Sequence, residues 1–472
     1  VTAKNILAYS HLHTENSSQV FGNRFPDQTD LSGRRELTVG ISIANPSYPV
    51  TSQETYVWEL QFQGVSDNGR WVWQTGAYYE NSQPDGISGN NAASFLYCDV
   101  ATLETSDISE VECFDPLSGI LGGVLSYQVE MEYLNRALYA QSTYDIFDSL
   151  SATLGLRYTW DETKGTGTKS IYRYTANVQQ APQVTTQSPK LKNAEPTGIF
   201  ELTYRPFENV MTYARYTRGY RQGTINLAAD PGLDTHEPET IDTYEIGLKS
   251  DFHWFIPGRF NIAVFENTLT DMQLQGGYIS TTSGPTTAIF NAGEGSSRGF
   301  EIEAFFRPLE SVKASLSYSY LDTELVESTD FCGAVAAVGF LEGFSCTPIA
   351  EAGDELPFAA ESSYVLNANW TLPLPPSLGL ITLGATYAYT GEQRIGADSQ
   401  SPDPYIDEFA LFNMNLNWAG IFGTPLDLVL YGTNLTDEEY ETYKSSTFRT
   451  LGFDSRSVGI PRMVGARVRL SF

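Results

Sequence analysis

Histidines and carboxylates are the side chains of this 472-residue sequence that could perform catalysis or bind a metal ion. His11 and His13 stand two positions apart, so on an extended strand both would lie on one face. His236 and His253 lie far away in sequence, and no cysteine stands near them to complete a zinc site. A hydrolase would need a Ser/His or Asp/His pair, and these histidines have no clear Ser or Asp partner. We therefore predict that the chain is not an enzyme and that it holds no cofactor or metal ion. We interpret His11 and His13 as ordinary residues near the end of a strand, at the rim of the fold.

A second set of polar residues recurs at alternate positions of apolar segments. In the last nine residues of the chain, Arg467 and Arg469 alternate with valine, alanine, leucine and phenylalanine. Side chains alternate across a strand, so one face is apolar and the other carries the two cations. In a transmembrane β-barrel the apolar face meets lipid and the polar face meets the lumen. The candidates for a lumen wall are Arg157, Tyr213, Arg215, Arg221, Glu245, Lys249, Glu301, Glu303, Lys313, Arg467 and Arg469.

Charged residues on a lumen wall can bind an anionic substrate or pair with opposite charges inside the barrel. The opposite register would place Arg and Lys against hydrocarbon, at about 2–4 kcal/mol each near the bilayer midplane. Glu301 and Glu303 stand at alternate positions, which fits a polar wall better than a general acid/base pair.

The composition favours a membrane barrel. Charged residues make up 18% and aromatic residues 13% of the chain, and mean hydropathy is −0.24. We find no apolar run of the ~18 residues that would mark a membrane-spanning helix. A net charge of −29 argues against a nucleic-acid partner, because neutralising phosphates needs Lys and Arg.

Sixteen segments alternate in this way and are predicted as strands. They span residues 2–10, 52–64, 70–81, 128–145, 150–161, 190–205, 210–222, 240–254, 259–275, 286–306, 312–325, 360–373, 380–392, 406–419, 426–436 and 460–472. The fold class is therefore all-β: a transmembrane antiparallel barrel.

The connections between these segments alternate between short and long. A barrel with short periplasmic turns and long extracellular loops has this pattern, whereas a soluble sandwich has no reason to place every long loop at one end. Aromatic residues mark both ends of the strands, as the two interfacial girdles of a barrel would. Trp71, Trp254, Trp370 and Trp418 lie near short turns, and Tyr79, Trp160, Tyr320 and Tyr389 lie near long loops.

The four cysteines form two close pairs in segments that are predicted as loops. Cys98 stands near Cys113, and Cys332 stands near Cys346. Two loop disulfides in an oxidising compartment are the favoured interpretation, with free thiols as the alternative.

Two stretches in the middle of the chain have a distinctive combination of residues. From Val210 the sequence is VMTYARYTRGYRQGTIN, followed by HEPETIDTYEIGLKSDF. They resemble the second half of TonB-dependent outer-membrane receptors, a family that carries a Y-x-R-G-[FY]-[KR]-x-G-x-x-N stretch and then P-E-[TS]-x-x-x-Y-E-x-G-x-K. Further resemblances are Asn291-Ala292-Gly293 with the Arg298–Glu303 strand, Asn434-Leu435-Thr436-Asp437 with Tyr440, and the terminal Phe472.

The resemblance implies uptake of a scarce, bulky nutrient across the outer membrane of a Gram-negative bacterium. Siderophores, cobalamin and oligosaccharides are examples of the cargo, and the small-molecule ligand itself is not identified. The implied partners are outer-membrane lipid, a TonB complex acting through a plug domain, and the barrel-assembly machinery, which would recognise the C-terminal strand ending at Phe472. Pairing with plug carboxylates is the favoured role of the wall cations.

The family barrel has about 22 strands around a plug, and this sequence shows sixteen strands and no plug. We therefore expect residues 1–472 to be a partial receptor barrel lacking the plug and about six strands, with a gapped or strained closure between the first and last strands. The alternative is a passive sixteen-stranded porin with a long loop folded into its lumen.

Overall fold

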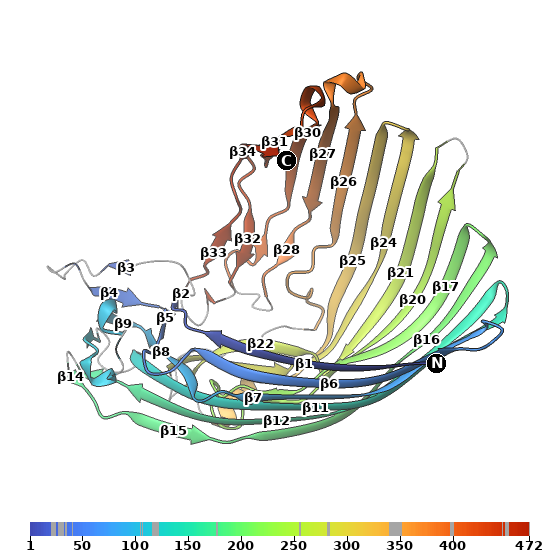
Figure 1. The fold of residues 1–472 in the computed structure, drawn as a ribbon. Helices are drawn as coiled ribbons and strands as arrows, with labels where there is room; N and C mark the ends of the chain where they lie inside the picture. Colours follow the sequence, from blue (N-terminus) through green and yellow to red (C-terminus); the bar gives the residue numbers. More distant parts are fainter. Residues whose placement is uncertain are drawn as a thin grey trace.

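Alternation of apolar and polar side chains along the chain produces one large, strongly curved antiparallel sheet in the computed structural model (Figure 1). This sheet holds 20 strands, and the all-β prediction is confirmed. The structure describes residues 1–472 except 20–24, 27–32, 34, 40, 104, 106, 116–121, 176–177, 254–255, 281–283, 339–351, 397–400, 446, 449–452 and 472.

Sixteen of these strands form a ladder in which every neighbouring pair is antiparallel, and they correspond one to one to the predicted segments. In ladder order they are β1 (Thr2–Thr14), β6 (Thr51–Val65), β7 (Trp71–Pro84), β11 (Gly123–Phe147), β12 (Leu150–Tyr172), β16 (Lys190–Phe207), β17 (Val210–Arg221), β20 (Glu239–Phe252), β21 (Gly258–Thr270), β24 (Gly293–Leu309), β25 (Val312–Ser328), β26 (Ser362–Thr371), β27 (Leu380–Thr390), β30 (Phe409–Ala419), β31 (Leu426–Thr433) and β34 (Met463–Leu470).

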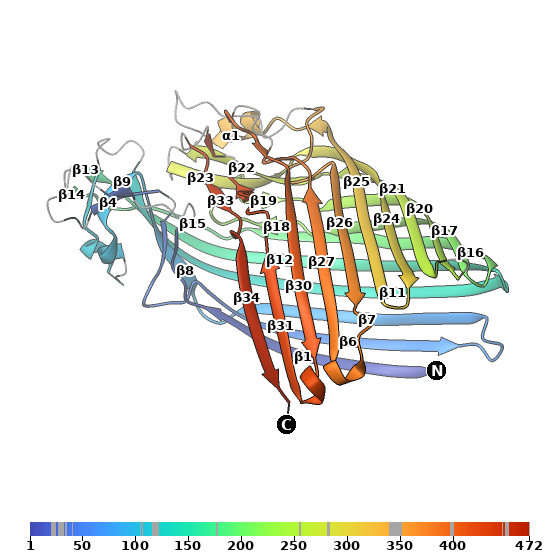
Figure 2. The same cartoon turned by 90° about the horizontal axis from the view of Figure 1, so that it is seen from above.

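The strands β1 and β34 are the two outer strands of this ladder. β1 pairs with β6, and β34 pairs with β31. In the described part of the chain no backbone pairing joins β1 to β34, and Figure 1 shows their edges apart, although the two strands overlap in the view of Figure 2. The sheet is therefore open between these two strands.

Short turns and long connections alternate along the ladder and gather at opposite ends of the strands (Figure 1). The short ones are 66–70, 148–149, 208–209, 253–257, 310–311, 372–379 and 420–425. The long ones are 15–50, 85–122, 173–189, 222–238, 271–292, 329–361, 391–408 and 434–462. The predicted division into two classes of connection is correct.

The long connections contain short elements of their own. Extensions of the main sheet are β2 (Ser18–Gln19), β5 (Ile41–Ala44), β8 (Ser88–Ser94) and β15 (Gln183–Gln187). A separate four-stranded sheet holds β3 (Phe25–Pro26), β4 (Arg35–Thr38), β9 (Leu96–Asp99) and β10 (Cys113–Phe114). Two-stranded pairs are β13 (Tyr174–Thr175) with β14 (Val178–Gln179), β18 (Thr224–Ile225) with β19 (Thr235–His236), β22 (Gln273–Ser280) with β23 (Gly284–Asn291), β28 (Gln393–Arg394) with β29 (Tyr405–Ile406), and β32 (Glu441–Lys444) with β33 (Arg456–Val458). The helical segments of the long connections are η1 (Val100–Leu103), η2 (Ile108–Glu110) and α1 (Phe331–Val338), while η3 (Pro376–Leu378) and η4 (Ile421–Gly423) lie in short turns.

Two predicted strands, 259–275 and 286–306, are wrong at the ends that meet a long connection. The chain leaves the ladder at Asp271, which has a positive φ of 54°. The next residue, Met272, is buried against Leu325. The β22–β23 hairpin then pairs with itself and not with the ladder. Local alternation continues through the turn, so the sequence pattern alone does not show where the chain leaves the sheet.

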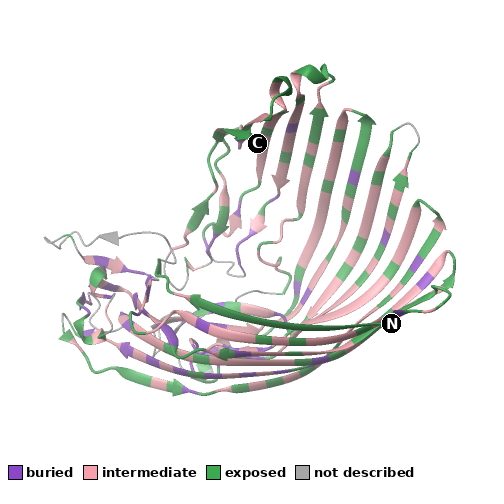
Figure 3. Cartoon of the chain, viewed as in Figure 1, coloured by how far each residue is buried: buried purple, intermediate pink, exposed green. Residues whose placement is uncertain are grey.

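Burial is concentrated in the long connections and not between layers of the main sheet (Figure 3). The largest buried cluster packs Ile41, Leu96, Leu103, Val124 and Tyr174 with their neighbours. On the ladder, by contrast, large apolar side chains at alternate positions remain well exposed. A continuous exposed apolar face of this kind fits contact with lipid. Among the described helices, none is long and apolar enough to cross a bilayer.

Candidate functional site

The predicted wall residues lie on one face of the sheet. Residues directly opposite each other on paired strands share a face, so the face can be followed from strand to strand. For example, Lys249 is opposite Asn261, and Asn261 is opposite Glu303. Following the ladder from β12 to β34 in this way places all eleven candidates on the same side. We call this side the charged face.

Four of the predicted wall residues come together on β17 and β20. The Tyr213 hydroxyl donates to Glu245 Oε1 at 2.5 Å, and Arg215 Nη2 donates to Glu245 Oε2 at 2.6 Å. Lys249 Nζ lies 5.8 Å from the centre of the Tyr213 ring, within range of a cation–π interaction. Gly247 makes room for that ring, because a Cβ there would lie 2.4 Å from it. The cluster is a preformed polar surface in which Arg215 and Glu245 form an ion pair and Lys249 contacts an aromatic ring.

A second cluster surrounds Arg157 on neighbouring strands. Its guanidinium lies 5.2 Å from the centre of the Tyr78 ring and 6.0 Å from that of Tyr139. The Tyr139 hydroxyl donates to Glu59 Oε1 at 2.6 Å. Sequence analysis missed the two tyrosines and the glutamate. Their alternate positions on the strands were the available signal, because each occupies the charged face of a predicted segment.

The remaining wall candidates are spread along the face. Arg221 Nη2 contacts Glu239 Oε2 at 2.8 Å, and Glu303 accepts from Asn261 Nδ2 at 3.2 Å. Glu301 is two residues before Glu303 on β24, so both side chains lie on the charged face. Within the described residues, Lys313, Arg467 and Arg469 form no ion pair. The structure thus brings some candidates together and leaves these three cations available on the charged face.

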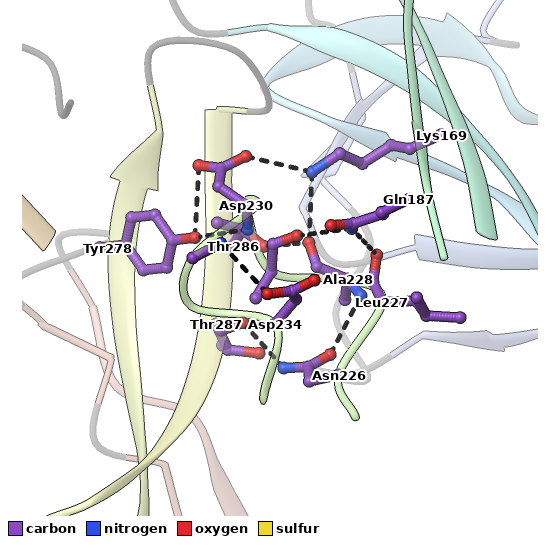
Figure 4. Close-up of polar contacts among 12 residues, drawn as sticks. Lys169, Gln187, Asn226, Leu227, Ala228, Asp230, Asp234, Tyr278, Thr286 and Thr287 are labelled. Carbon is purple, nitrogen blue, oxygen red and sulfur yellow. Dashed lines mark hydrogen bonds and ion pairs between the residues drawn. The ribbon is translucent and has the colours of Figure 1, made fainter. Parts of the chain in front are cut away.

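A buried ion pair fixes connection 222–238 against the loop end of β12 (Figure 4). Lys169 Nζ lies 3.3 Å from Asp230 Oδ1, and the two side chains are only 2% and 7% exposed. The Tyr278 hydroxyl donates to Asp230 Oδ2 at 3.3 Å and accepts from the Asp230 backbone N–H at 3.0 Å. Lys169 Nζ also donates to the Ala228 carbonyl at 3.3 Å. Three segments distant in sequence therefore meet at one carboxylate.

Side-chain donors also hold the backbone of the same connection. Gln187 Nε2 donates to the carbonyls of Leu227 and Ala229 at 3.0 and 3.1 Å. The Leu227 side chain lies over Gly167 of β12, where a Cβ would lie 3.1 Å from it. Gly167 and Lys169 are an even number of residues away from Arg157 on β12, so all three lie on the same face of the strand. The connection therefore packs on the charged face. Tyr278, Ala229, Leu233, Ala288 and Val335 form the apolar side of this loop cluster.

His236 is a further buried group in this connection that the sequence did not single out as functional. Burial and the nearby positive charge of Arg221 lower the pKa of its imidazole. Its Nδ1 has no hydrogen-bond partner within the described chain. The neutral ring is therefore the form that the closed connection accommodates.

Acidification is expected to loosen connection 222–238 through His236. When the connection opens, the ring regains an ordinary pKa near 6.5, so the opened state binds more protons than the closed state. Stabilisation is complete above about pH 6.5 and is lost as the pH falls toward the lowered pKa. Hydrogen exchange in 222–238, corrected for the intrinsic pH effect, should be faster at acidic pH. His236→Gln should remove this dependence, and an unchanged dependence in that variant would show that another group causes it.

Of the two predicted cysteine pairs, one lies wholly within the described residues. Cys98 and Cys113 form a disulfide that links β9 to β10, as predicted. Cys332 lies in α1, while its expected partner Cys346 lies outside the described residues. Phe472, the proposed assembly signal, also lies outside the described residues. Among the described residues, no group of three or more His, Cys, Asp or Glu side chains is arranged to hold a metal ion.

A long antiparallel ladder with an exposed apolar face, a charged face and one end of long connections defines a membrane-barrel wall. The profile described as "TonB dependent receptor-like, beta-barrel" matches residues 2–435, which span the ladder from β1 to β31. The chain therefore belongs to the TonB-dependent receptor β-barrel family, as its motifs suggested. This is a family of outer-membrane receptors and not of enzymes.

Individual relatives are distant in sequence. The chain is 24% identical over 422 residues to "Probable TonB-dependent siderophore receptor PiuA" of Acinetobacter baumannii, covering 83% of this chain and 50% of the relative. It thus spans half the length of that curated relative. The ferric yersiniabactin uptake receptor FyuA of Yersinia pestis matches with a TM-score of 0.60 and 17% identity, over 95% of this chain and 65% of the other. The ferric-catecholate import receptor Fiu of E. coli K12 matches with a TM-score of 0.52 and 13% identity, over 99% and 71%. These two structures support the fold.

Proposed function

We propose that this chain forms part of the barrel wall of an outer-membrane receptor that takes up ferric siderophores by TonB-dependent transport. The family match along nearly the whole ladder is the observation that carries this proposal. The curated relative is a probable siderophore receptor, and the two similar structures are a ferric yersiniabactin uptake receptor and a ferric-catecholate import receptor, which favours this cargo over cobalamin or oligosaccharides. The comparisons give no support to a passive porin.

The long connections are the proposed capture surface. They lie at one end of the strands, and the buried Lys169–Asp230 pair holds one of them against the charged face. The tyrosines and paired charges around Arg157 and Glu245 would line the route inward. Such a surface offers a bulky complex both aromatic contact and hydrogen-bonding groups.

The cations at the opposite end of the strands have a different proposed role. Lys313 is the second residue of β25, next to the short turn 310–311. Arg469 is opposite Asp427 near the short turn 420–425. Arg467 is two residues before Arg469 on β34 and lies on the same face. This end lies away from the capture surface. We propose that these cations pair with carboxylates of a plug domain outside residues 1–472, through which a TonB complex would act.

Uptake of radiolabelled iron by iron-starved cells tests the transport mechanism. Cells that produce the complete receptor should accumulate label from a ferric siderophore, and dissipating the proton-motive force should reduce uptake to the level of cells lacking the gene. The reason is that energised release depends on the inner-membrane potential, whereas diffusion through a pore does not. Uptake that continues at its full rate after dissipation would contradict the proposal and favour a passive channel.

A further inference from the structure

A groove lies where connections 15–50 and 85–122 meet the loop ends of β11 and β12. Its volume is about 460 Å³, within the ~300–1,000 Å³ range of small-molecule sites. Asn45 and Tyr48 come from the first connection, and Asp107 of the second is the N-cap of η2. The two strands contribute Ser126, Gln128, Thr168, Ser170 and Tyr172. Segments distant in sequence therefore form its walls.

The groove lies on the face opposite the charged face. In the pairing of β11 with β12, Ser126 is opposite Ser170 and Gln128 is opposite Thr168. Thr168 and Ser170 are an odd number of residues away from Arg157, so their side chains point away from the charged face. A ligand in this groove would therefore lie outside the barrel wall, off the route that we propose for the cargo.

The groove lies further out along β12 than the residues expected at the membrane interface. Trp160 belongs to the aromatic residues predicted to form the outer girdle, and Trp and Tyr prefer the headgroup level of a membrane. Thr168 and Ser170 are eight and ten residues further along β12, about 26 and 33 Å along the strand. The groove therefore faces the aqueous surroundings of the cell surface and not lipid.

Polar groups without a protein partner are concentrated in this groove. Every described residue that lines it, apart from Ile108, carries a hydroxyl, amide or carboxyl group. Four of these side chains form no hydrogen bond with another described residue: Ser126, Gln128, Ser170 and Tyr172. Most small-molecule sites are lined mainly by apolar side chains. A ligand that fits this groove must therefore offer many hydrogen-bonding groups of its own.

The two residues from connection 15–50 also have unused hydrogen-bonding capacity. Asn45 is only 8% exposed, and its Oδ1 accepts from the Ser47 backbone N–H at 2.8 Å. Its Nδ2 has no partner in the part of the chain that the structure describes. The Tyr48 hydroxyl is buried and likewise has no partner there. A ligand hydroxyl that reached these groups would supply bonds that the protein itself does not make.

Asp107 carries the single charge among the described residues that line the groove. The Ser109 hydroxyl and backbone N–H donate to its Oδ1 at 2.6 and 3.0 Å. These bonds hold the pKa of the Asp107 carboxyl below its usual value, so the group is ionised at neutral pH. Its Oδ2 remains available as an acceptor. Because the charge is negative and no described lining residue is Lys or Arg, the groove disfavours an anionic ligand.

We propose that this groove binds a neutral hexose unit of an oligosaccharide. A pyranose ring presents hydroxyl groups around its edge and C–H groups on its faces, which match the polar walls and the rings of Tyr48 and Tyr172. Asp107 would accept from sugar hydroxyls, and such charge-assisted bonds are stronger than neutral ones. Tyr172 packs on the loop core, the buried cluster that contains the Cys98–Cys113 disulfide, so its ring is held in place before a ligand binds.

Saturation-transfer-difference NMR on the complete receptor tests the proposal, in a polyoxyethylene detergent that carries no sugar. The probes are maltose, lactose and α-1,2-mannobiose as neutral sugars, with choline as an organic cation and acetate as an anion. At least one sugar should bind saturably, whereas choline and acetate should not bind at the same site. Absence of binding by all three sugars would overturn the proposal. Choline that binds and displaces the sugar would show an organic-cation site instead.

Two tyrosines give a matched pair of variants. Tyr172→Phe removes a hydroxyl from the groove and keeps the ring on the loop core, so affinity for the sugar should fall about twofold to tenfold. Tyr127→Phe removes a hydroxyl on the charged face of β11, which also has no partner in the described chain, and should leave the affinity unchanged. Unchanged affinity in Tyr172→Phe, or an equal loss in both variants, would show that the sugar binds elsewhere.

A second variant tests the polar wall formed by the strands. Gln128→Ala/Ser170→Ala removes two side chains that form no hydrogen bond with another described residue, so the fold should be retained. Affinity for the sugar should fall about tenfold or more, because two bonds to its hydroxyls are lost. Heat-modifiable migration on gels verifies that the variant is folded. A folded variant with the affinity of the parent protein would show that these groups are simply hydrated surface, and the site would be wrong.

Discussion

Replacing Lys169 by methionine is expected to release connection 222–238 from the sheet. The variant leaves Asp230 with one cation fewer in a site where both side chains are almost fully buried. Removing one partner of a buried ion pair typically costs about 3–5 kcal/mol, because the remaining charge has lost its compensation and stays out of water. Amide hydrogen exchange in 222–238 should therefore accelerate by about a hundredfold or more, as should proteolysis there.

Lys164→Met is the matched control for this experiment. Lys164 belongs to the same strand, β12, but it lies on the opposite face, and its side chain is 42% exposed where it pairs with Glu132 and Glu162. Its loss should change exchange in 222–238 very little, because exposed pairs contribute about 0–1 kcal/mol. Combining Lys169→Met with Asp230→Asn should restore part of the protection, since the second change removes the buried negative charge that Lys169 balances in the parent protein. Equal exchange in Lys169→Met and the parent protein would show that other contacts hold the connection.

The ladder was predictable because its signal is local. A strand with one face toward lipid alternates apolar and polar residues at period two, and this pattern stands in the sequence itself. Val312–Tyr320 illustrates it: Lys313 and the serines fall on one face, and the pairing of β25 with β24 and β26 keeps them there. The same alternation placed Tyr213, Arg215, Glu245 and Lys249 on one face before any partner was known.

The outer ends of the strands were not predictable in this way. β12 continues to Tyr172, although the predicted strand ended at residue 161. Residues 162–172 carry Thr and Lys on both faces, with Gly on one face and Ser on the other, so no apolar face marks them as a strand. They are extended because connection 222–238 covers one face of them, through contacts such as Lys169 with Asp230, 61 residues away. Such long-range contacts leave no periodic signal in the sequence.

Replacing both Cys98 and Cys113 by serine is expected to destabilise the loop core while leaving the ladder intact. The disulfide joins residues separated by 15 positions, and a link closing a loop of this length contributes about 3 kcal/mol by restricting the unfolded chain. Both sulfurs belong to buried residues that pack with Leu96, Leu103 and Tyr174. Exchange in 85–122 should therefore increase strongly, and addition of reductant should have no further effect on this segment in the variant.

The segments that lose protection from hydrogen exchange show whether this disulfide stabilises only the loop core or the whole sheet. Tyr174 donates a hydrogen bond to the Val111 carbonyl at 3.1 Å, so opening of 85–122 should extend to the 173–189 connection. Among the described residues, the ladder strands β24 to β27 contribute no side chain to this buried core, and their protection should stay at the parent level. Cys332→Ser/Cys346→Ser serves as the control and should leave exchange in 85–122 unchanged. If the Cys98→Ser/Cys113→Ser variant kept full protection there, the apolar packing alone would be sufficient to hold the loop core.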